Sequence, residues 1–88
     1  MEVLEQTQGL ITQIIGPVID VEFQAGNLPE IYTALRIYKE DGSYVVAEVQ
    51  QMLGSNKVRT VAMSSTDGLK RGMKVENTNS PIKIPVGK

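Results

Sequence analysis

The chain has 88 residues and a formal net charge of -1, with basic and acidic residues intermixed along its length. It contains no cysteine and no histidine, which excludes disulfides, thiolate catalysis and the imidazole chemistry of most general bases near neutral pH. A chain of this length favours one small domain with a single core, and the lack of a basic excess argues against binding nucleic acid through its phosphates.

Residues 1–8 are short, polar and acidic, without a clear period. They lack the basic start and apolar centre of a signal peptide, and they are acidic where a transit peptide is basic. No apolar run approaches the roughly 20 residues of a membrane-spanning helix. We therefore expect a chain that works in a soluble compartment, with residues 1–8 as a loose arm available to a sheet edge.

Residues 9–23 are the stretch around which the other elements are arranged. Apolar side chains of one parity recur here, interrupted by a Gln and a Pro: Ile11, Ile15, Ile19, Val21 and Phe23. The other parity is mixed, which is typical of a strand with one dry and one half-wet face. Gly16-Pro17 leaves the parity of the apolar set unchanged, so the pattern predicts one long bent strand rather than a hairpin. We expect Val21 and Phe23 to lie in the core.

Two further strands are expected on either side of a tight turn. Residues 24–30 combine Gly, Asn and Pro and are typical of a loop. Residues 31–38 alternate again, with one set facing one side (Ile31, Leu35, Ile37) and a second set facing the other (Tyr32, Arg36, Tyr38). Residues 39–43 contain Asp-Gly, which favours a hairpin turn. Residues 44–53 form the next strand, with Val45, Ala47, Val49 and Leu53 opposite Glu48 and Gln50.

The C-terminal part of the chain holds shorter elements. Residues 54–56 are a turn, and residues 57–63 are a strand whose buried side stays unassigned, because both parities hold apolar residues. A polar corner and a tight reversal over residues 64–72 precede a strand over 73–77, in which Met73 and Val75 alternate with Lys74 and Glu76. Residues 78–81 are interpreted as a turn. A last extended piece contains Ile82, Ile84 and Val86, and Pro85 makes it an edge strand or a linker.

No window of the sequence has a helical period with caps, and no internal repeat appears. About six short strands joined by turns predict an all-β fold, a small closed antiparallel barrel without helices. The alternative layout, a sandwich, usually takes about 100 residues. The expected organisation is an arm over 1–8, the barrel over 9–80, and a last strand or linker over 81–88.

The sequence contains no motif that carries catalysis. It has neither a GxxxxGK[ST] loop nor a GxGxxG turn, and no serine has a histidine to activate it. Thr66-Asp67-Gly68 reverses the Asp-Thr-Gly order of an aspartic protease. We therefore predict no catalytic residue, no cofactor-binding residue and no metal ligand. An enzyme site completed across a homodimer, the remaining alternative, would need a symmetric pair of acids.

An oligonucleotide-binding barrel is the main competing function, because small barrels often bind single strands. The residues that bind the nucleic acid would be four basic side chains and three stacking tyrosines: Lys57, Arg59, Lys70, Arg71, Tyr32, Tyr38 and Tyr44. With one Phe and no Trp, we favour the interpretation that the cations solubilise outward faces and the tyrosines cover strand ends. Asp20 and Glu22 are likewise interpreted as a solvated face rather than as an acidic pair that contacts a partner.

Six blocks, in matching order and spacing, closely resemble the N-terminal β-barrel of the catalytic β subunits of F-type ATP synthases. They are GLITQIIGPVIDVEF (9–23), LPEIYTAL (28–35), EVQQMLG (48–54), VRTVAM (58–63), TDGLKRGM (66–73) and SPIKIPVG (80–87). The α subunits and vacuolar-type relatives share the barrel, but they do not combine GPVIDV (16–21) with LPEIY (28–32). The family commonly has glycine where this chain has Asn79. Asparagine also tolerates a left-handed backbone, so we expect the turn to survive.

The resemblance implies a structural module of a larger subunit. In that family the parent subunit synthesises and hydrolyses ATP coupled to proton transport, and the domain after the barrel binds ATP or ADP with magnesium. No catalytic or cofactor-binding residue therefore carries over to this chain. Six barrels, alternating between α and β subunits, form a crown that holds the hexameric head together.

The resemblance also implies partners, a location and a site. The partners are α subunits, with no nucleic acid and no direct membrane insertion, and a monomer remains one option for the isolated domain. The location is the soluble face of an energy-transducing membrane, on the cytoplasmic side in bacteria or at the thylakoid. In photosynthetic members the acid of the Thr-Asp-Gly corner lies near a cleft between subunits, so Thr66 and Asp67 are the expected interface residues. The alternative is that Asp67 only caps its turn.

Overall fold

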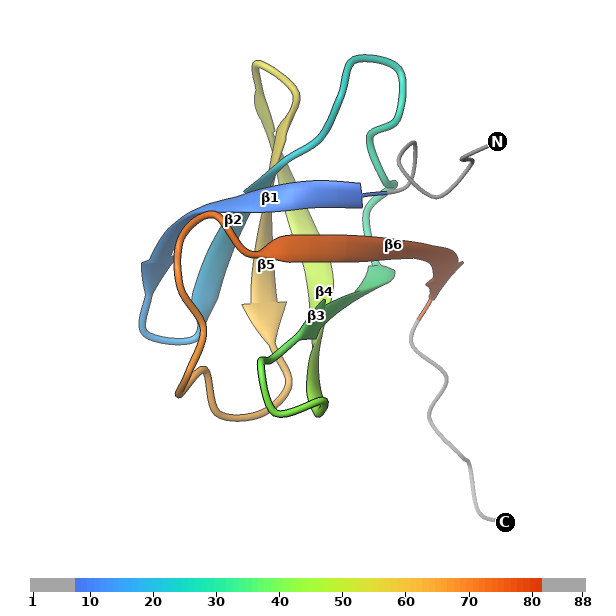
Figure 1. The fold of residues 1–88 in the computed structure, drawn as a ribbon. Coiled ribbons are helices and arrows are strands. Elements are labelled where there is room, and N and C mark those ends of the chain that lie inside the picture. Colours follow the sequence, from blue (N-terminus) through green and yellow to red (C-terminus); the bar gives the residue numbers. More distant parts are fainter. Residues whose placement is uncertain (1–7, 82–88) are drawn as a thin grey trace, which may run out of the picture.

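The computed structural model describes residues 8–81, which form a closed barrel of antiparallel strands without a helix (Figure 1). The strands are β1 (Gln8–Ile15), β2 (Val18–Glu22), β3 (Thr33–Tyr38), β4 (Tyr44–Gly54), β5 (Lys57–Ala62) and β6 (Lys74–Pro81). Their order around the barrel is β1-β2-β5-β4-β3-β6, and β6 pairs with β1 to close it. The predicted fold class is confirmed.

Residues 9–23 are a hairpin, and the prediction of one bent strand is wrong. Ile15 lies opposite Val18, so Gly16 and Pro17 are the two central residues of the turn. Gly16 has a φ of 57°, which suits the first central position of a type II′ turn, and the fixed φ of proline suits the second. The carbonyl of Pro17 accepts a hydrogen bond from the N–H of Ala62 at 2.8 Å, which holds the turn against β5.

Two changes of parity that cancel explain why the hairpin resembles one strand in the sequence. Ile11 pairs with Val21 and Gln13 pairs with Asp20, so Thr12 is an extra residue in a β-bulge. The bulge turns the following side chains to the opposite face, and the two-residue turn reverses the parity again. Ile15, which shares the apolar parity of Val21 and Phe23 in the sequence, is therefore 62 % exposed, while its neighbour Ile14 packs against the core.

The β3–β4 hairpin follows the prediction over most of its length. Tyr38 pairs with Tyr44, and the turn between them is closed by a hydrogen bond from Lys39 N–H to the Ser43 carbonyl at 2.8 Å. The predicted inward side chains of this hairpin are buried, namely Leu35, Ile37, Val45, Ala47 and Val49. Ile31 is an exception, because it precedes β3 and is 37 % exposed. Leu53 is only half-buried, since β4 has register shifts on both sides of Met52.

The closed barrel determines the orientation of β5, which the sequence left open. Val58, Thr60 and Ala62 face inward, and the Thr60 hydroxyl donates to the carbonyl of Ile19 at 2.8 Å. This hydrogen bond satisfies a polar group that is fully buried, at a position where the sequence showed no preference for either side.

Residues 78–81, expected to be a turn, continue β6. Thr33 pairs with Pro81 and Leu35 pairs with Asn77, so the strand bulges between these two pairs. Asn79 has a φ of 59°, and its N–H donates to the Asn77 side-chain oxygen at 2.8 Å. The predicted left-handed backbone at Asn79 is confirmed, although it serves a bulge. The expected extended piece with Ile82, Ile84 and Val86 lies outside the described residues.

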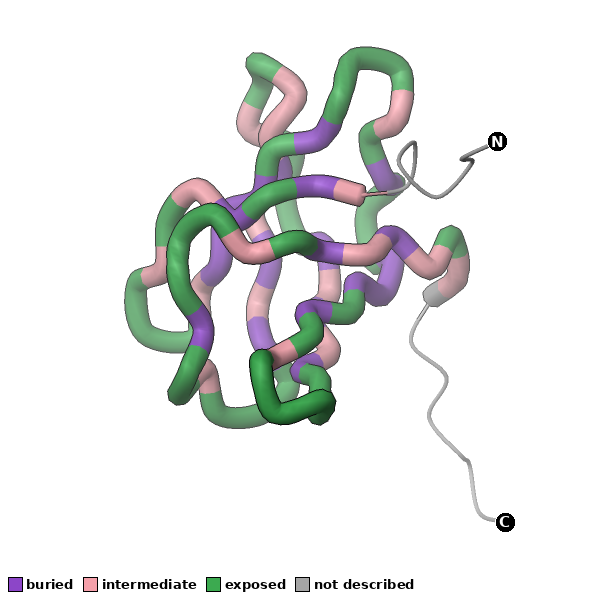
Figure 2. Tube along the Cα trace, in the orientation of Figure 1, coloured by how far each residue is buried: buried purple, intermediate pink, exposed green. Residues whose placement is uncertain are grey.

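The core fills the inside of the barrel, as the alternation of buried and exposed residues along the tube shows in Figure 2. The predicted core residues Val21 and Phe23 are 0 % and 3 % exposed. Gly9 is required beside them. A Cβ at this position would lie 2.8 Å from the Glu22 carbonyl oxygen and 2.9 Å from Phe23 Cε2. Close packing thus explains the glycine, without any need for an unusual φ.

Candidate subunit-contact surface

The outer face of β1, β2 and β5 carries two neighbouring cross-strand rows, and we call it the β1–β2–β5 face. The apolar row is Ile15, Val18 and Val61, and the polar row is Gln13, Asp20 and Arg59. Cross-strand neighbours lie close enough for their side chains to touch. The sequence did not group these residues, because their adjacency depends on the hairpin, the bulge and the pairing of β2 with β5.

Asp20 and Arg59 form a bidentate ion pair in the polar row. Arg59 donates from Nε to Oδ1 and from Nη2 to Oδ2, each at 2.9 Å. The Asp20 side chain is only 9 % exposed, whereas that of Arg59 is 41 % exposed. The hydrogen bonds to Asp20, followed by its charge, raise the pKa of Arg59. The pair is therefore preformed and locally neutral, and part of the Arg59 side chain is still accessible.

This pair corrects two interpretations from the sequence. Asp20 was expected on a solvated face, but it is buried and bound to Arg59. Arg59 was one candidate phosphate ligand of the competing nucleic-acid function, but its guanidinium is committed to a carboxylate. Glu22 is exposed as expected, and it lies opposite Lys57 in the register, so this neighbouring row also combines one acid with one base.

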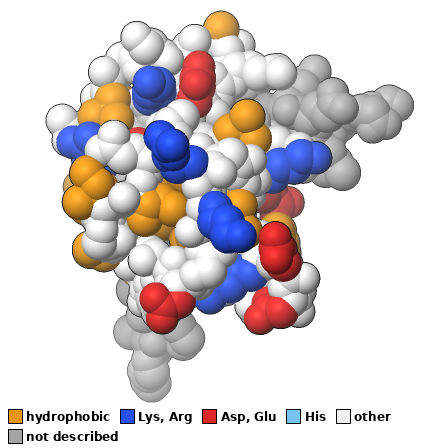
Figure 3. All heavy atoms as spheres, turned by 60° about the vertical axis from the view of Figure 1, so that its left-hand side comes forward, with side chains coloured by type: hydrophobic (Ala, Val, Ile, Leu, Met, Phe, Trp, Pro, Cys, Tyr) orange, Lys and Arg blue, Asp and Glu red, His pale blue; other side chains and the backbone are white. Residues whose placement is uncertain are grey.

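The β1–β2–β5 face is slightly hollowed. An open depression of about 250 Å³ is lined by Gln13, Ile15, Val18, Asp20 and Arg59. Figure 3 turns the side with the β1–β2 turn toward the viewer, and apolar side chains appear there among intermixed basic and acidic ones. A face with exposed aliphatic groups and internally paired charges can cover a protein surface without leaving a charge unpaired.

Thr66 and Asp67, the interface residues expected from the resemblance, lie beside this face. The Thr66 hydroxyl donates to the carbonyl of Gly16 at 3.3 Å, which connects the corner to the β1–β2 turn. Asp67 is exposed, and its N–H donates to the Ser65 hydroxyl oxygen at 3.1 Å. The cap of this turn is thus provided by the Ser65 side chain. An interface role for Thr66 and Asp67 stays a prediction.

The tyrosines do not form a row of stacking platforms. Tyr32 precedes β3 and Tyr38 ends it, so they lie at opposite ends of that strand. Tyr38 and Tyr44 meet edge to face, with ring centroids 5.5 Å apart and planes inclined by 62°. Arg36 lies 5.4 Å from the Tyr44 ring centroid. The Tyr38 and Tyr44 rings therefore pack against neighbours of their own chain, and Tyr32 lies apart from them, which disfavours a continuous base-stacking surface.

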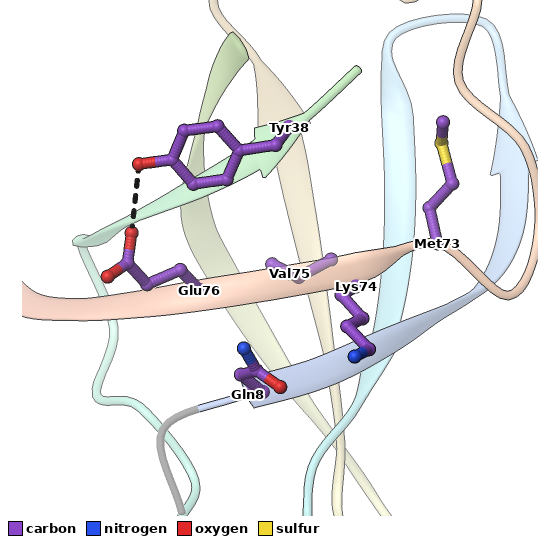
Figure 4. A pocket seen from close by; sticks show the side chains of 6 residues that line it. All are labelled: Gln8, Tyr38, Met73, Lys74, Val75 and Glu76. Carbon is purple, nitrogen blue, oxygen red and sulfur yellow. Dashed lines mark hydrogen bonds between the residues drawn. The ribbon is translucent and has the colours of Figure 1, made fainter. Parts of the chain in front are cut away.

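A second depression, of about 430 Å³, lies beside this aromatic pair (Figure 4). It is lined by Gln8, Tyr38, Met73, Lys74, Val75 and Glu76. The Tyr38 hydroxyl donates to Glu76 Oε1 at 3.2 Å at its rim, and Arg36 lies 3.8 Å from the same oxygen. Tyr38 and Arg36 thus both contact the Glu76 carboxylate at the rim of this depression.

The described residues do not bring a set of metal-ligating side chains together. Within residues 8–81, no three His, Cys, Asp or Glu side chains come together as a metal site would need. Every buried side-chain nitrogen or oxygen in this part of the chain has a hydrogen-bond partner. The same residues include no helix that is long and apolar enough to cross a membrane.

The fold and this face define a class of protein: a small closed antiparallel barrel that presents a mixed apolar and charge-paired outer surface. Residues 11–79 match the beta-barrel domain of the ATP synthase alpha/beta family. The match covers more than half of the chain, and the chain belongs to that family. A domain of this family points to assembly in an ATP synthase hexamer within a membrane-associated complex.

Proposed function

We propose that this barrel is the crown domain of a β subunit of an F-type ATP synthase. Its role is structural: it packs against the barrels of neighbouring α subunits in an alternating hexamer. The assignment to β rather than α rests on the resemblance of the blocks over residues 9–23 and 28–35. The family match over residues 11–79 supports the barrel domain that both subunit types share.

The observation that carries the assembly role is the β1–β2–β5 face. Protein interfaces favour apolar contacts and arginine and disfavour unpaired charge in their centre. Ile15 is 62 % exposed on this face, and the adjacent Asp20–Arg59 pair has already lost most of its water around the carboxylate. A neighbouring barrel could cover the face without a new charge-burial cost, because the pair is complete before association.

The remaining features of this proposal concern the parent complex. ATP or ADP with magnesium would bind in the parent subunit, outside this barrel. The complex would sit on the soluble face of an energy-transducing membrane, on the cytoplasmic side in bacteria or at the thylakoid. Titration of the 88-residue chain with Mg-ATP in a calorimeter should give no binding heat. Micromolar affinity would contradict a purely structural module.

The test of assembly compares two surface substitutions on the same strand. Ile15→Lys places a charge in the apolar row, whereas Leu10→Lys changes another exposed aliphatic residue of β1, which is 50 % exposed, lies opposite Glu22 and belongs to neither of the two rows. Binding of each variant to purified α subunits is measured by sedimentation. We expect Ile15→Lys to lose association and Leu10→Lys to keep it. Equal binding of both variants would contradict this face as the contact, and no binding of the unchanged chain would contradict the α-subunit partner.

A further inference from the structure

The chain contains two Asp-Gly pairs, Asp41-Gly42 and Asp67-Gly68, in exposed turns. Both glycines have a left-handed backbone, with φ of 92° and 88°. An Asp-Gly pair is chemically special because glycine has no side chain to hinder attack of its nitrogen on the preceding carboxyl group. The two pairs therefore allow a comparison within one molecule.

At Asp41, both reacting groups are held by hydrogen bonds. Its Oδ1 accepts from the Ser43 N–H at 2.9 Å and from the Ser43 hydroxyl at 2.6 Å. The Gly42 N–H donates to the Lys39 carbonyl at 3.1 Å. The bonds from Ser43 lower the pKa of Asp41, which keeps the carboxylate ionised and less reactive toward a nucleophile. The turn must break these bonds before a ring can form.

At Asp67, the turn is closed by other groups. The Asp67 N–H donates to Ser65 Oγ at 3.1 Å, and the Leu69 N–H donates to the Thr66 carbonyl at 3.0 Å. Within residues 8–81, neither the Asp67 carboxylate nor the Gly68 N–H makes a hydrogen bond. The carboxyl carbon and the attacking nitrogen are thus both available without loss of a local contact.

We propose that Asp67 is a site of spontaneous succinimide and isoaspartate formation. Asp41 is protected from the same reaction by the hydrogen bonds within its own turn, over residues 39–43. The Gly68 nitrogen forms a bond to Cγ of the protonated Asp67 carboxyl group, and one Cγ–O bond breaks. The leaving hydroxyl group and the Gly68 N–H proton depart together as one water molecule. A second water opens the ring at either carbonyl and gives aspartate or isoaspartate. No oxidant or reductant is involved, and the proposal does not depend on the assembly role.

The modification would change the shape of the corner beside the β1–β2–β5 face. In isoaspartate the main chain passes through the former side-chain carboxyl group, which lengthens the backbone by one methylene group. Thr66, whose hydroxyl binds the Gly16 carbonyl, immediately precedes this site. Isomerisation is therefore expected to displace the corner that carries Thr66.

The test is incubation of the folded chain in mildly acidic heavy-oxygen water, followed by peptide mapping with mass spectrometry. Each passage through the ring incorporates one heavy oxygen, so label reports ring formation at each position. We expect label and isoaspartate to accumulate on the order of ten times faster at Asp67 than at Asp41, since each hydrogen bond that must break slows ring closure several-fold. The chain unfolded in urea should react at similar rates at both positions.

Two variants separate protection by hydrogen bonds from general differences between the turns. Ser43→Ala removes the hydroxyl that binds Asp41, and it should speed labelling at Asp41 without changing Asp67. Asp67→Glu keeps the charge but cannot form the five-membered ring, so it should abolish labelling at that position. Equal rates in the folded chain, faster reaction at Asp41, or no label at Asp67 when the unfolded chain reacts would each overturn the proposal.

Discussion

Truncation of Phe23 to alanine should remove much of the stability of this barrel. Phe23 is the chain's single phenylalanine, it is 3 % exposed, and it belongs to the core cluster at the end of β2. Its ring packs against the backbone at Gly9, where a Cβ would lie 2.9 Å from Cε2. Because β1 cannot move inward past the hydrogen bonds of the closed sheet, the space left by the ring should not refill.

The expected loss is a large part of the stability of the domain. Phe→Ala substitutions in cores cost about 3–5 kcal/mol through lost burial and the remaining cavity. A domain of 88 residues is stable by about 4–13 kcal/mol at typical values per residue. The melting temperature should fall by at least about 12 °C, because 1 kcal/mol shifts it by about 4–8 °C in domains of this size.

The assay is thermal and urea unfolding followed by far-ultraviolet circular dichroism, since the chain has no tryptophan. The matched control is Tyr44→Ala, which removes an aromatic ring that is 50 % exposed on the outside of the barrel. We expect this control to lose only about 1 kcal/mol, from its contacts with Tyr38 and Arg36. If both variants melted within a few degrees of the unchanged chain, the assignment of Phe23 to an unrelaxed core would be refuted.

Three further predictions concern packing and charge. Gly9→Ala should destabilise by about 1–3 kcal/mol through overpacking, and a gain of stability in urea unfolding would contradict the contacts described. Arg59→Met should lower the melting temperature because it leaves the buried Asp20 charge unpaired, and adding Asp20→Asn should restore most of the loss. A double variant no more stable than the single one would count against the pair. The pKa of Asp41, measured by NMR titration, should lie below its ordinary value of 3.8 because Ser43 binds the carboxylate. Its stabilising contribution is then present above about pH 4 and is lost as the pH falls through the lower folded value, and Asp41→Asn should abolish this dependence.

The candidate contact surface shows how far the sequence could lead toward the site. The resemblance selected Thr66 and Asp67, and these residues lie next to the β1–β2 turn. The Asp20–Arg59 pair was missed, although each residue occupies an outward position in a strand. The two residues are 39 positions apart, and nothing local indicates that β2 pairs with β5.

The sequence by itself determined the properties that depend on neighbouring residues. Alternation of apolar side chains predicted strands, Asp-Gly predicted the turn between β3 and β4, and Asn79 was recognised as able to adopt a left-handed backbone. Each of these results follows from steric preferences within a few residues, which operate before any distant contact forms.

The tertiary structure alone decided how these strands are used. Whether residues 9–23 bend or reverse depends on a bulge at Thr12 whose change of parity cancels that of the turn, so both arrangements give the same pattern in the sequence. The inward side of β5 depends on its partners β2 and β4, because Val61 and Thr60 are almost equal in size and both fit a strand. Pairing between distant strands determines which side chains lie in the core and which lie on the surface. These pairings are set only when the barrel closes.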